Sequence, residues 1–203
     1  QRNRERADFL LGLFYAGGGL GILLSGLVVP LTLERFGAGS WGTAWAALAV
    51  IAVPLALGLH LARGESAAAP SSAKTRPPYR DMRWLLPGYL FFGAGYIAYM
   101  TFVIALLRDR GFENSFRSFF WVILGLAAAG SSPLWGRLPK RMRGRRELAI
   151  VNATTALGVL IVIPFHNAWA AVLSAIIFGG SFLAVVGAVT SVARSLVPST
   201  RWT

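Results

Sequence analysis

The chain has no cysteine, only two histidines, and no acidic residue inside any of its long apolar stretches. The absence of cysteine excludes disulfides, thiolate catalysis and cysteine-type metal sites. An intramembrane serine protease would need a deep histidine base beside a serine such as Ser131 or Ser181, but His60 and His166 stand near run ends. Paired histidine and carboxylate ligands for a metal are missing from the runs as well. We therefore expect no enzyme, and no bound metal or cofactor.

Charge is also scarce, because only 14% of the residues are charged whereas 55% are hydrophobic and the mean hydropathy is +0.58. The hydrophobic residues form long runs of roughly the 17–25 residues that a helix needs to cross a bilayer. A Lys or Arg at the centre of such a helix costs about 2.5–3.5 kcal/mol, and here the charges stand at the run ends. The runs are Phe9–Leu33, Trp41–Leu61, Trp84–Leu107, Phe116–Trp135, Leu148–Phe165 and Ala168–Leu196. The sequence predicts an all-α, polytopic membrane bundle of six transmembrane helices.

The net charge of +12 is distributed unevenly between alternate connections. Sixteen of the 20 Lys and Arg residues precede the first run, lie at or beyond the end of the last run, or lie in the second and fourth connections. Basic segments stay on the cytoplasmic side, so we predict that both ends of the chain are cytoplasmic. Nucleic acid is not an expected main partner; binding of nucleic acid or lipid head groups by the basic loops stays open as a side role.

The connection 63–83 is long, small, polar and proline-bearing, which is typical of a flexible linker. The chain starts at Gln1 rather than at Met, and it stops just outside the sixth run. We interpret it as a fragment of a longer membrane protein, in which the remaining helices would be its partners.

The connection between the fourth and fifth runs holds the most specific local pattern. It resembles the Gly-x-Leu-x-Asp-Arg-x-Gly-Arg-Arg signature loop of the major facilitator superfamily. Lys140 replaces the Asp of that signature, and one extra residue precedes the second glycine. The matching residues are Gly136, Leu138, Arg141, Gly144, Arg145 and Arg146. A plain basic cytoplasmic loop would look similar.

The order of the loops favours the family interpretation. In that superfamily a long cytoplasmic loop separates two six-helix halves, and the signature recurs two helices after it. The resemblance thus implies helices five to ten of a twelve-helix fold. Residues 1–62 would be the last two helices of the N-terminal half-bundle, 63–83 the cytoplasmic linker, and 84–203 the first four helices of the C-terminal half-bundle.

Glycines of the first run resemble a fifth-helix antiporter motif of the superfamily, but Ile22 replaces its proline. Without proline the helix bend is lost, so antiport is not implied. Gly17 and Gly21 are expected instead to allow close helix packing. In the third run, the string from Gly95 to Phe102 resembles the seventh helix of the YbfB/YjiJ-like branch.

Polar side chains inside the runs are candidates for substrate contact, because polarity in hydrocarbon is costly. By family analogy the first, third, fourth and sixth runs would line the path. We therefore predict substrate binding by Tyr15, Tyr96, Tyr99 and Thr190. Hydroxyl groups in membrane helices also bond their own backbone or a neighbouring helix, which is the competing interpretation of each.

The resemblance implies a secondary carrier of a bacterial inner membrane that moves a small molecule by alternating access. The candidate residues are aromatic or hydroxylic and carry no fixed charge, which favours a hydrophobic or weakly polar metabolite or drug over a highly charged solute. The alternative from another class is a complete six-helix membrane protein with a binding, assembly or channel role. Coding sequence on either side of the chain would distinguish the two.

Overall fold

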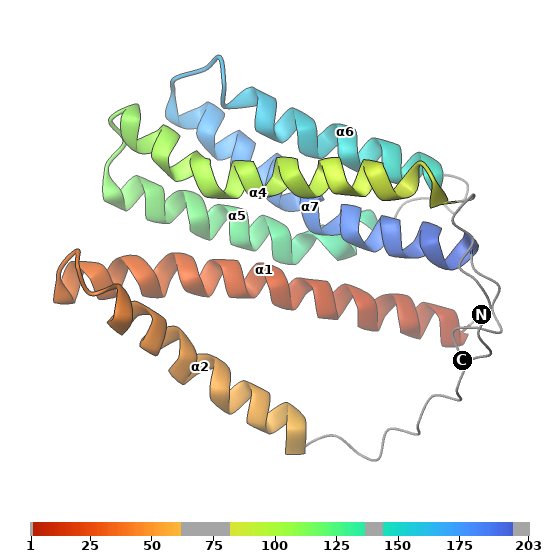
Figure 1. Ribbon diagram of the computed structural model, residues 1–203, viewed down its shortest axis with the longest axis horizontal. Coiled ribbons are helices and arrows are strands. Elements are labelled where there is room, and N and C mark those ends of the chain that lie inside the picture. Colours follow the sequence, from red (N-terminus) through yellow and green to blue (C-terminus); the bar gives the residue numbers. More distant parts are fainter. Residues whose placement is uncertain (1, 62–81, 137–143, 197–203) are drawn as a thin grey trace.

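The computed structural model describes residues 2–61, 82–136 and 144–196, and this part of the chain is helical apart from short turns (Figure 1). The predicted all-α class is confirmed, with one helix on each apolar run. Most of the predicted linker 63–83 lies outside the described residues. In chain order the helices are α1 (Arg2–Phe36), α2 (Trp41–Leu61), α4 (Leu85–Asp109), α5 (Asn114–Trp135), α6 (Arg145–Ile161) and α7 (Ala168–Leu196).

Five of these helices are long and apolar enough to cross a bilayer. The exception is α6, whose 17 residues span about 25 Å of helix. Its run was expected to reach Phe165, but the helix ends at Ile161. Pro164 lacks the N–H that would bond the carbonyl of Leu160. That carbonyl instead accepts from the N–H of Ile163 at 3.1 Å, in a tighter turn that ends the helix. The polytopic helical bundle is confirmed, with α6 as the shortest of the described helices.

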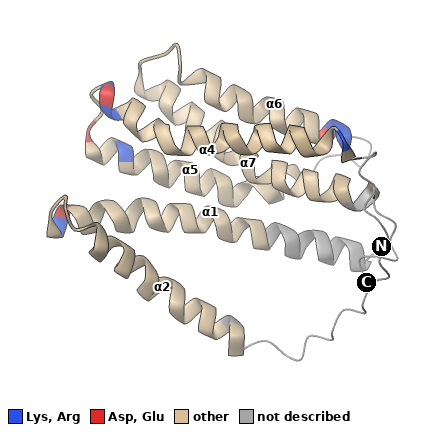
Figure 2. Cartoon of the chain, in the orientation of Figure 1, with Lys and Arg blue, Asp and Glu red and all other residues tan. Residues whose placement is uncertain are grey.

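Successive helices run in opposite directions, so α4 and α6 both begin at one end of the bundle (Figure 1). We call it the arginine-rich end, because α1 also begins there with Arg2, Arg4 and Arg6, in addition to Arg83, Arg145 and Arg146. Charged residues of the described helices lie at the two ends and leave the middle uncharged (Figure 2). This distribution is the one expected of helices whose middle lies in hydrocarbon.

Helix α5 packs against α1 on one side and against α7 on the other. Its Phe120 and Leu124 side chains are completely buried. Glycines allow the backbones to approach closely, because a Cβ on Gly125 would fall 2.5 Å from the backbone nitrogen of Leu23 in α1. A Cβ on Gly179 of α7 would likewise fall 2.5 Å from the carbonyl oxygen of Leu124. Contacts of this kind replace side-chain bulk with backbone packing.

Hydroxyl groups join α4, α6 and α7. Ser174 of α7 donates to the carbonyl oxygen of Gly158 in α6 at 2.6 Å, and the hydroxyl of Tyr99 in α4 lies 2.7 Å from Ser174 Oγ. Because the one proton of Ser174 goes to Gly158, Tyr99 must donate to Ser174. A second contact joins α6 to α7, where Thr155 Oγ1 and Ser181 Oγ lie 2.9 Å apart.

Arg110 closes the opposite end of this group of helices. Its guanidinium donates to the carbonyl oxygens of Val162 at 2.5 Å, Ile163 at 2.9 Å and Phe165 at 3.2 Å. Carbonyls beyond the end of a helix have no partner within it, so the guanidinium satisfies groups that α6 leaves unpaired.

Helix α2 packs mainly on α1 and diverges from it along its length (Figure 1). Ala44 is buried at the start of this contact, whereas Trp45 and Val50 are largely exposed. The apolar surface of α2 is therefore available to lipid or to other helices.

Candidate functional site

Three tyrosines from α1 and α4 gather beside α7, and we call Tyr15, Tyr89 and Tyr96 the tyrosine cluster. The rings of Tyr89 and Tyr96 are joined through the ring of Phe92, and Tyr89 has an electrostatic interaction with Tyr15. The ring of Tyr15 lies over Gly187 of α7, where an added Cβ would come within 3.6 Å of Tyr15 Cε2. No hydrogen bond joins the three hydroxyls to another of the described residues. The structure thus brings together two predicted binding residues, Tyr15 and Tyr96, with Tyr89 near both.

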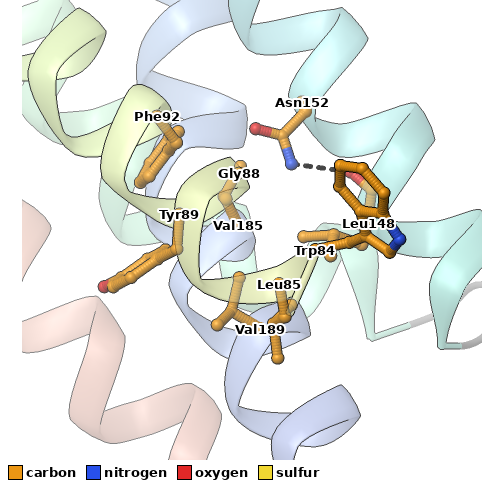
Figure 3. Close-up of a pocket in the computed structure, with 9 residues that line it drawn as sticks. All are labelled: Trp84, Leu85, Gly88, Tyr89, Phe92, Leu148, Asn152, Val185 and Val189. Carbon is orange, nitrogen blue, oxygen red and sulfur yellow. Dashed lines mark hydrogen bonds between the residues drawn. The ribbon is translucent and has the colours of Figure 1, made fainter. Parts of the chain in front are cut away.

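Tyr89 is a candidate that the sequence reasoning missed. It stands three residues before Phe92 and seven before Tyr96, so the three share one face of α4. That spacing was the available signal, but the prediction considered only part of the stripe. Figure 3 shows the Tyr89 ring directed away from the side chains of α6 that are drawn with it.

An aromatic row extends from the tyrosine cluster across to α7. The ring centroids of Tyr89 and Phe92 are 5.8 Å apart, and those of Phe92 and Tyr96 are 5.4 Å apart. Tyr96 then stacks on Phe182 of α7 at 6.1 Å. These separations are typical of favourable aromatic pairs, which hold ring positions without fixed charge. The cluster therefore offers ring faces and phenol hydroxyls to a ligand.

Tyr99 lies in the core rather than in the tyrosine cluster. Only 7% of its surface is exposed, and its ring packs on Phe178 with centroids 4.0 Å apart. Its hydroxyl is used by Ser174. This arrangement favours a structural role that joins α4 to α7 over the predicted contact with substrate.

Thr190, the fourth predicted binding residue, bonds its own helix. Its Oγ1 donates to the carbonyl oxygen of Val186 at 2.9 Å. It stands three residues after Gly187, on the face of α7 that meets Tyr15. Thr190 therefore lies about one helical turn beyond the residue that meets Tyr15, with its proton already in use.

The glycines Gly17 and Gly21 do not contact another described helix, because a Cβ on either would meet nothing within 4 Å. Close packing of α1 does occur, but on another face of the helix, at Gly19 and Gly26. A Cβ on Gly19 would clash with the backbone of Ala128 and Ala129 in α5, and one on Gly26 would fall 2.7 Å from Trp121 Cβ. Small-residue spacing marked the correct helix, but periodicity alone could not select the face.

Part of the predicted signature loop is described. Gly136 ends α5, Arg145 is exposed at the start of α6, and Arg141 lies outside the described residues. Gly144 has a φ of +88°, a backbone conformation that residues other than glycine rarely adopt. Its N–H points to Glu147 Oε2 at 3.4 Å. Glycine is thus required at the turn into α6.

Among the described residues, no group of three or more His, Asp or Glu side chains is placed to hold a metal ion. Comparison with known proteins then adds the identity of the fold. The model of the family described as "Uncharacterised MFS-type transporter YbfB" matches residues 1–203. No curated protein and no solved structure matches the chain. With its apolar helices and uncharged middle, the chain belongs to this family of major-facilitator transporters, and it is a multi-pass membrane transport protein rather than an enzyme.

Proposed function

We propose that the chain is part of a secondary carrier that moves a small, uncharged or weakly polar molecule by alternating access. Residues 1–62 would close one half-bundle and residues 84–203 would open the other, with 63–83 as the linker and further helices completing both. The substrate path would run between α1 and α4, against α7. Carriers of this kind bind substrate where their two repeated halves meet.

The observation that supports this proposal best is the tyrosine cluster. Its side chains come from both proposed halves, Tyr15 from α1 and Tyr89 with Tyr96 from α4. A molecule bound among them would contact both halves, so its binding could favour one arrangement over the other. No charged residue lies in the middle of the described helices to bind a strongly charged solute (Figure 2).

The contact between α1 and α5 supports movement between the halves. It is made at Gly19, Gly26 and Gly125, and no side-chain hydrogen bond crosses it among the described residues. A contact of backbones and small groups can shift without breaking polar bonds, whereas α4, α6 and α7 are tied by hydroxyls. Sliding at α1 and α5 would open the path on alternate sides.

Conservative substitutions test the site in the natural full-length protein, reconstituted in liposomes and screened for efflux of neutral aromatic and aliphatic compounds. For a transported compound, Tyr15→Phe, Tyr89→Phe and Tyr96→Phe should each raise KM, because each removes one phenol hydroxyl and keeps the ring. Phe91→Leu is the control, since Phe91 is on α4 but 77% exposed. Unchanged KM in all three tyrosine variants would contradict the proposed site.

Orientation is tested separately, and the lack of cysteine makes introduced cysteines unambiguous. We propose that the arginine-rich end and both chain ends are cytoplasmic, in a bacterial inner membrane. Met82→Cys should then be protected from a membrane-impermeant maleimide in intact cells, whereas Gly39→Cys at the other end should react. The reverse pattern would contradict this orientation without affecting the proposed site.

A further inference from the structure

A cavity of about 140 Å³ opens between α4, α6 and α7 near the arginine-rich end (Figure 3). Its walls are mainly apolar and include Leu85 and Phe92 from α4, Leu148 and Asn152 from α6, and Val185 and Val189 from α7. Tyr89 of the tyrosine cluster also lines one side of it. An apolar cavity of this size accommodates a benzene-sized group. It is therefore wide enough for a segment of a hydrocarbon chain.

The cavity lies directly below basic side chains. Arg145, Leu148 and Asn152 are spaced three and four residues apart, so they share one face of α6, and the latter two line the cavity. Immediately before α4, Trp84 lines the cavity, and the guanidinium of Arg83 lies 5.8 Å from the centroid of the Trp84 ring. The rim of an apolar space thus carries positive charge at the start of two helices.

Acidic side chains do not neutralise this charge within the described residues near the rim. The first turn of α4 has no acid, and Glu147 in the first turn of α6 is engaged with the N–H of Gly144 at 3.4 Å. Arg83, Arg145 and Arg146 are all exposed. A ligand that fits must combine an apolar part inside the cavity with an anionic part at the rim.

We infer that this cavity is a binding site for an anionic phospholipid, which places one acyl chain between α4, α6 and α7 and its phosphate against Arg83 and Arg145. The bilayer supplies such a molecule at the depth where the helices end. Basic side chains beside gaps between membrane helices bind lipid head groups through the same charge complementarity. The lipid would fill space between α4 and α6, which otherwise meet mainly through α7. The inference does not depend on the identity of the transported molecule.

Gly88 allows a test that fills the cavity. It lines the space, and a Cβ built on it meets nothing within 4 Å, so the backbone accepts a side chain there and Gly88→Leu should reduce the volume of the cavity. Gly95→Leu is the matched control, because Gly95 lies on the same helix, outside the cavity and with equal room. Native mass spectrometry of the natural full-length protein, reconstituted with equal phosphatidylglycerol and phosphatidylcholine, measures the lipid retained. We expect one retained phosphatidylglycerol, reduced at least fivefold by Gly88→Leu and unchanged by Gly95→Leu.

The charged rim is tested in the same measurement. Arg83→Gln with Arg145→Gln should abolish the preference for phosphatidylglycerol over phosphatidylcholine, whereas Arg35→Gln at the opposite end should leave it unchanged. Equal retention of the two lipids by the unmodified protein would overturn the inference. Retention unaffected by Gly88→Leu, or no retained lipid because other helices fill the space, would overturn it as well.

Tryptophan fluorescence supplies a second test, which does not require the Gly88→Leu variant to fold. Dibrominated phosphatidylglycerol, added at low mole fraction to phosphatidylcholine vesicles, should quench tryptophan emission more than dibrominated phosphatidylcholine does. The difference should disappear in Trp84→Phe, because Trp84 lines the cavity. Equal quenching by the two brominated lipids would contradict a site selective for the anionic head group.

Discussion

The contact of α1 with α5 and the contacts among α4, α6 and α7 hold the bundle together by different means. The first depends on glycines, where Gly19, Gly26 and Gly125 bring backbones together without side-chain hydrogen bonds among the described residues. The second depends on polar bonds, from Tyr99 through Ser174 to Gly158 and between Thr155 and Ser181. Polar bonds fix position and register, whereas glycine contacts fix only distance. We therefore expect α4, α6 and α7 to move as one unit and α1 to move against α5.

Filling the glycine contact should have the largest effect. Gly125→Leu would push α1 away from α5, because its Cβ would fall 2.5 Å from the nitrogen of Leu23. Overpacking of a close contact costs about 1–3 kcal/mol, and we expect the upper part of that range in the free energy of unfolding. Titration with SDS in detergent micelles, followed by tryptophan fluorescence, measures it. Transport by the full-length protein should fall at least tenfold.

Gly130→Leu is the control for this substitution. Gly130 is on the same helix, and a Cβ there meets nothing within 4 Å. Equal destabilisation by the two variants would mean that helix propensity or insertion, and not the approach of α1, determines the result. Full transport by Gly125→Leu would contradict the view that transport requires the close backbone approach of α1 and α5.

Loss of the Arg110 side chain should come next in size. Arg110→Ala leaves the carbonyls of Val162, Ile163 and Phe165 without their shared donor. Hydrogen bonds to charged groups contribute about 1.5–3 kcal/mol, and partial exposure lowers the expected loss to about 1–2 kcal/mol. Hydrogen exchange should rise mainly around residues 160–166. Arg110→Lys should recover little, because an ammonium group cannot reach several carbonyls with a planar fork.

Arg108→Ala is the comparison for charge alone. Arg108 is exposed and pairs only with its neighbour Asp109 at 3.4 Å among the described residues. If Arg108→Ala were as damaging as Arg110→Ala, net charge at this end would matter more than the bonds to α6.

The polar bonds among α4, α6 and α7 predict an order between two variants. Ser174→Ala should destabilise more than Tyr99→Phe, because it removes the bond to Gly158 and leaves the buried Tyr99 hydroxyl unpaired. Tyr99→Phe removes one bond and leaves Ser174 bonded to Gly158. Hydrogen bonds between membrane helices contribute about 0.6 kcal/mol on average, whereas an unpaired buried group costs about 1–3 kcal/mol. If Tyr99→Phe were the more destabilising variant in SDS titration, the assignment of Tyr99 as donor to Ser174 would be wrong.

The sequence predicted the helices of this molecule better than it predicted the contacts between them. Run length and charge position predicted the helices, because the cost of charge in hydrocarbon acts on every segment separately. The signature-like loop between Gly136 and Arg146 pointed to the superfamily, and the family match confirms it. Helix ends were harder to predict, because the apolar run of α6 continues to Phe165 whereas the helix ends at Ile161, three residues before Pro164.

Faces and partners were harder to predict, since they depend on how helices pack. Tyr96 and Tyr99 look equivalent in sequence, but Tyr99 is buried against Phe178 while Tyr96 lies beside Tyr89. Gly17 and Gly19 differ by two positions, and only Gly19 meets α5. A helix surface turns through most of a circle within a few residues, so residue type without a known neighbour cannot select the face.

The smallest expected effects are those of alanine substitutions at two buried serines on neighbouring helices, Ser131 and Ser181. Ser131 Oγ of α5 is buried without a hydrogen-bond partner among the described residues, whereas Ser181 Oγ of α7 bonds the carbonyl of Ile177 and lies 2.9 Å from Thr155 Oγ1. Removing an unpaired polar atom relieves a desolvation cost, but it also leaves a small void in a packed interior. Because the two effects oppose each other, Ser131→Ala should change the free energy of unfolding by no more than about 0.5 kcal/mol, in the stabilising direction. Ser181→Ala should cost about 1 kcal/mol, because Thr155 loses its partner across the helices. A loss as large for Ser131→Ala would place a bound molecule at that hydroxyl, and α5 would then hold a ligand next to the contact along which it is expected to slide.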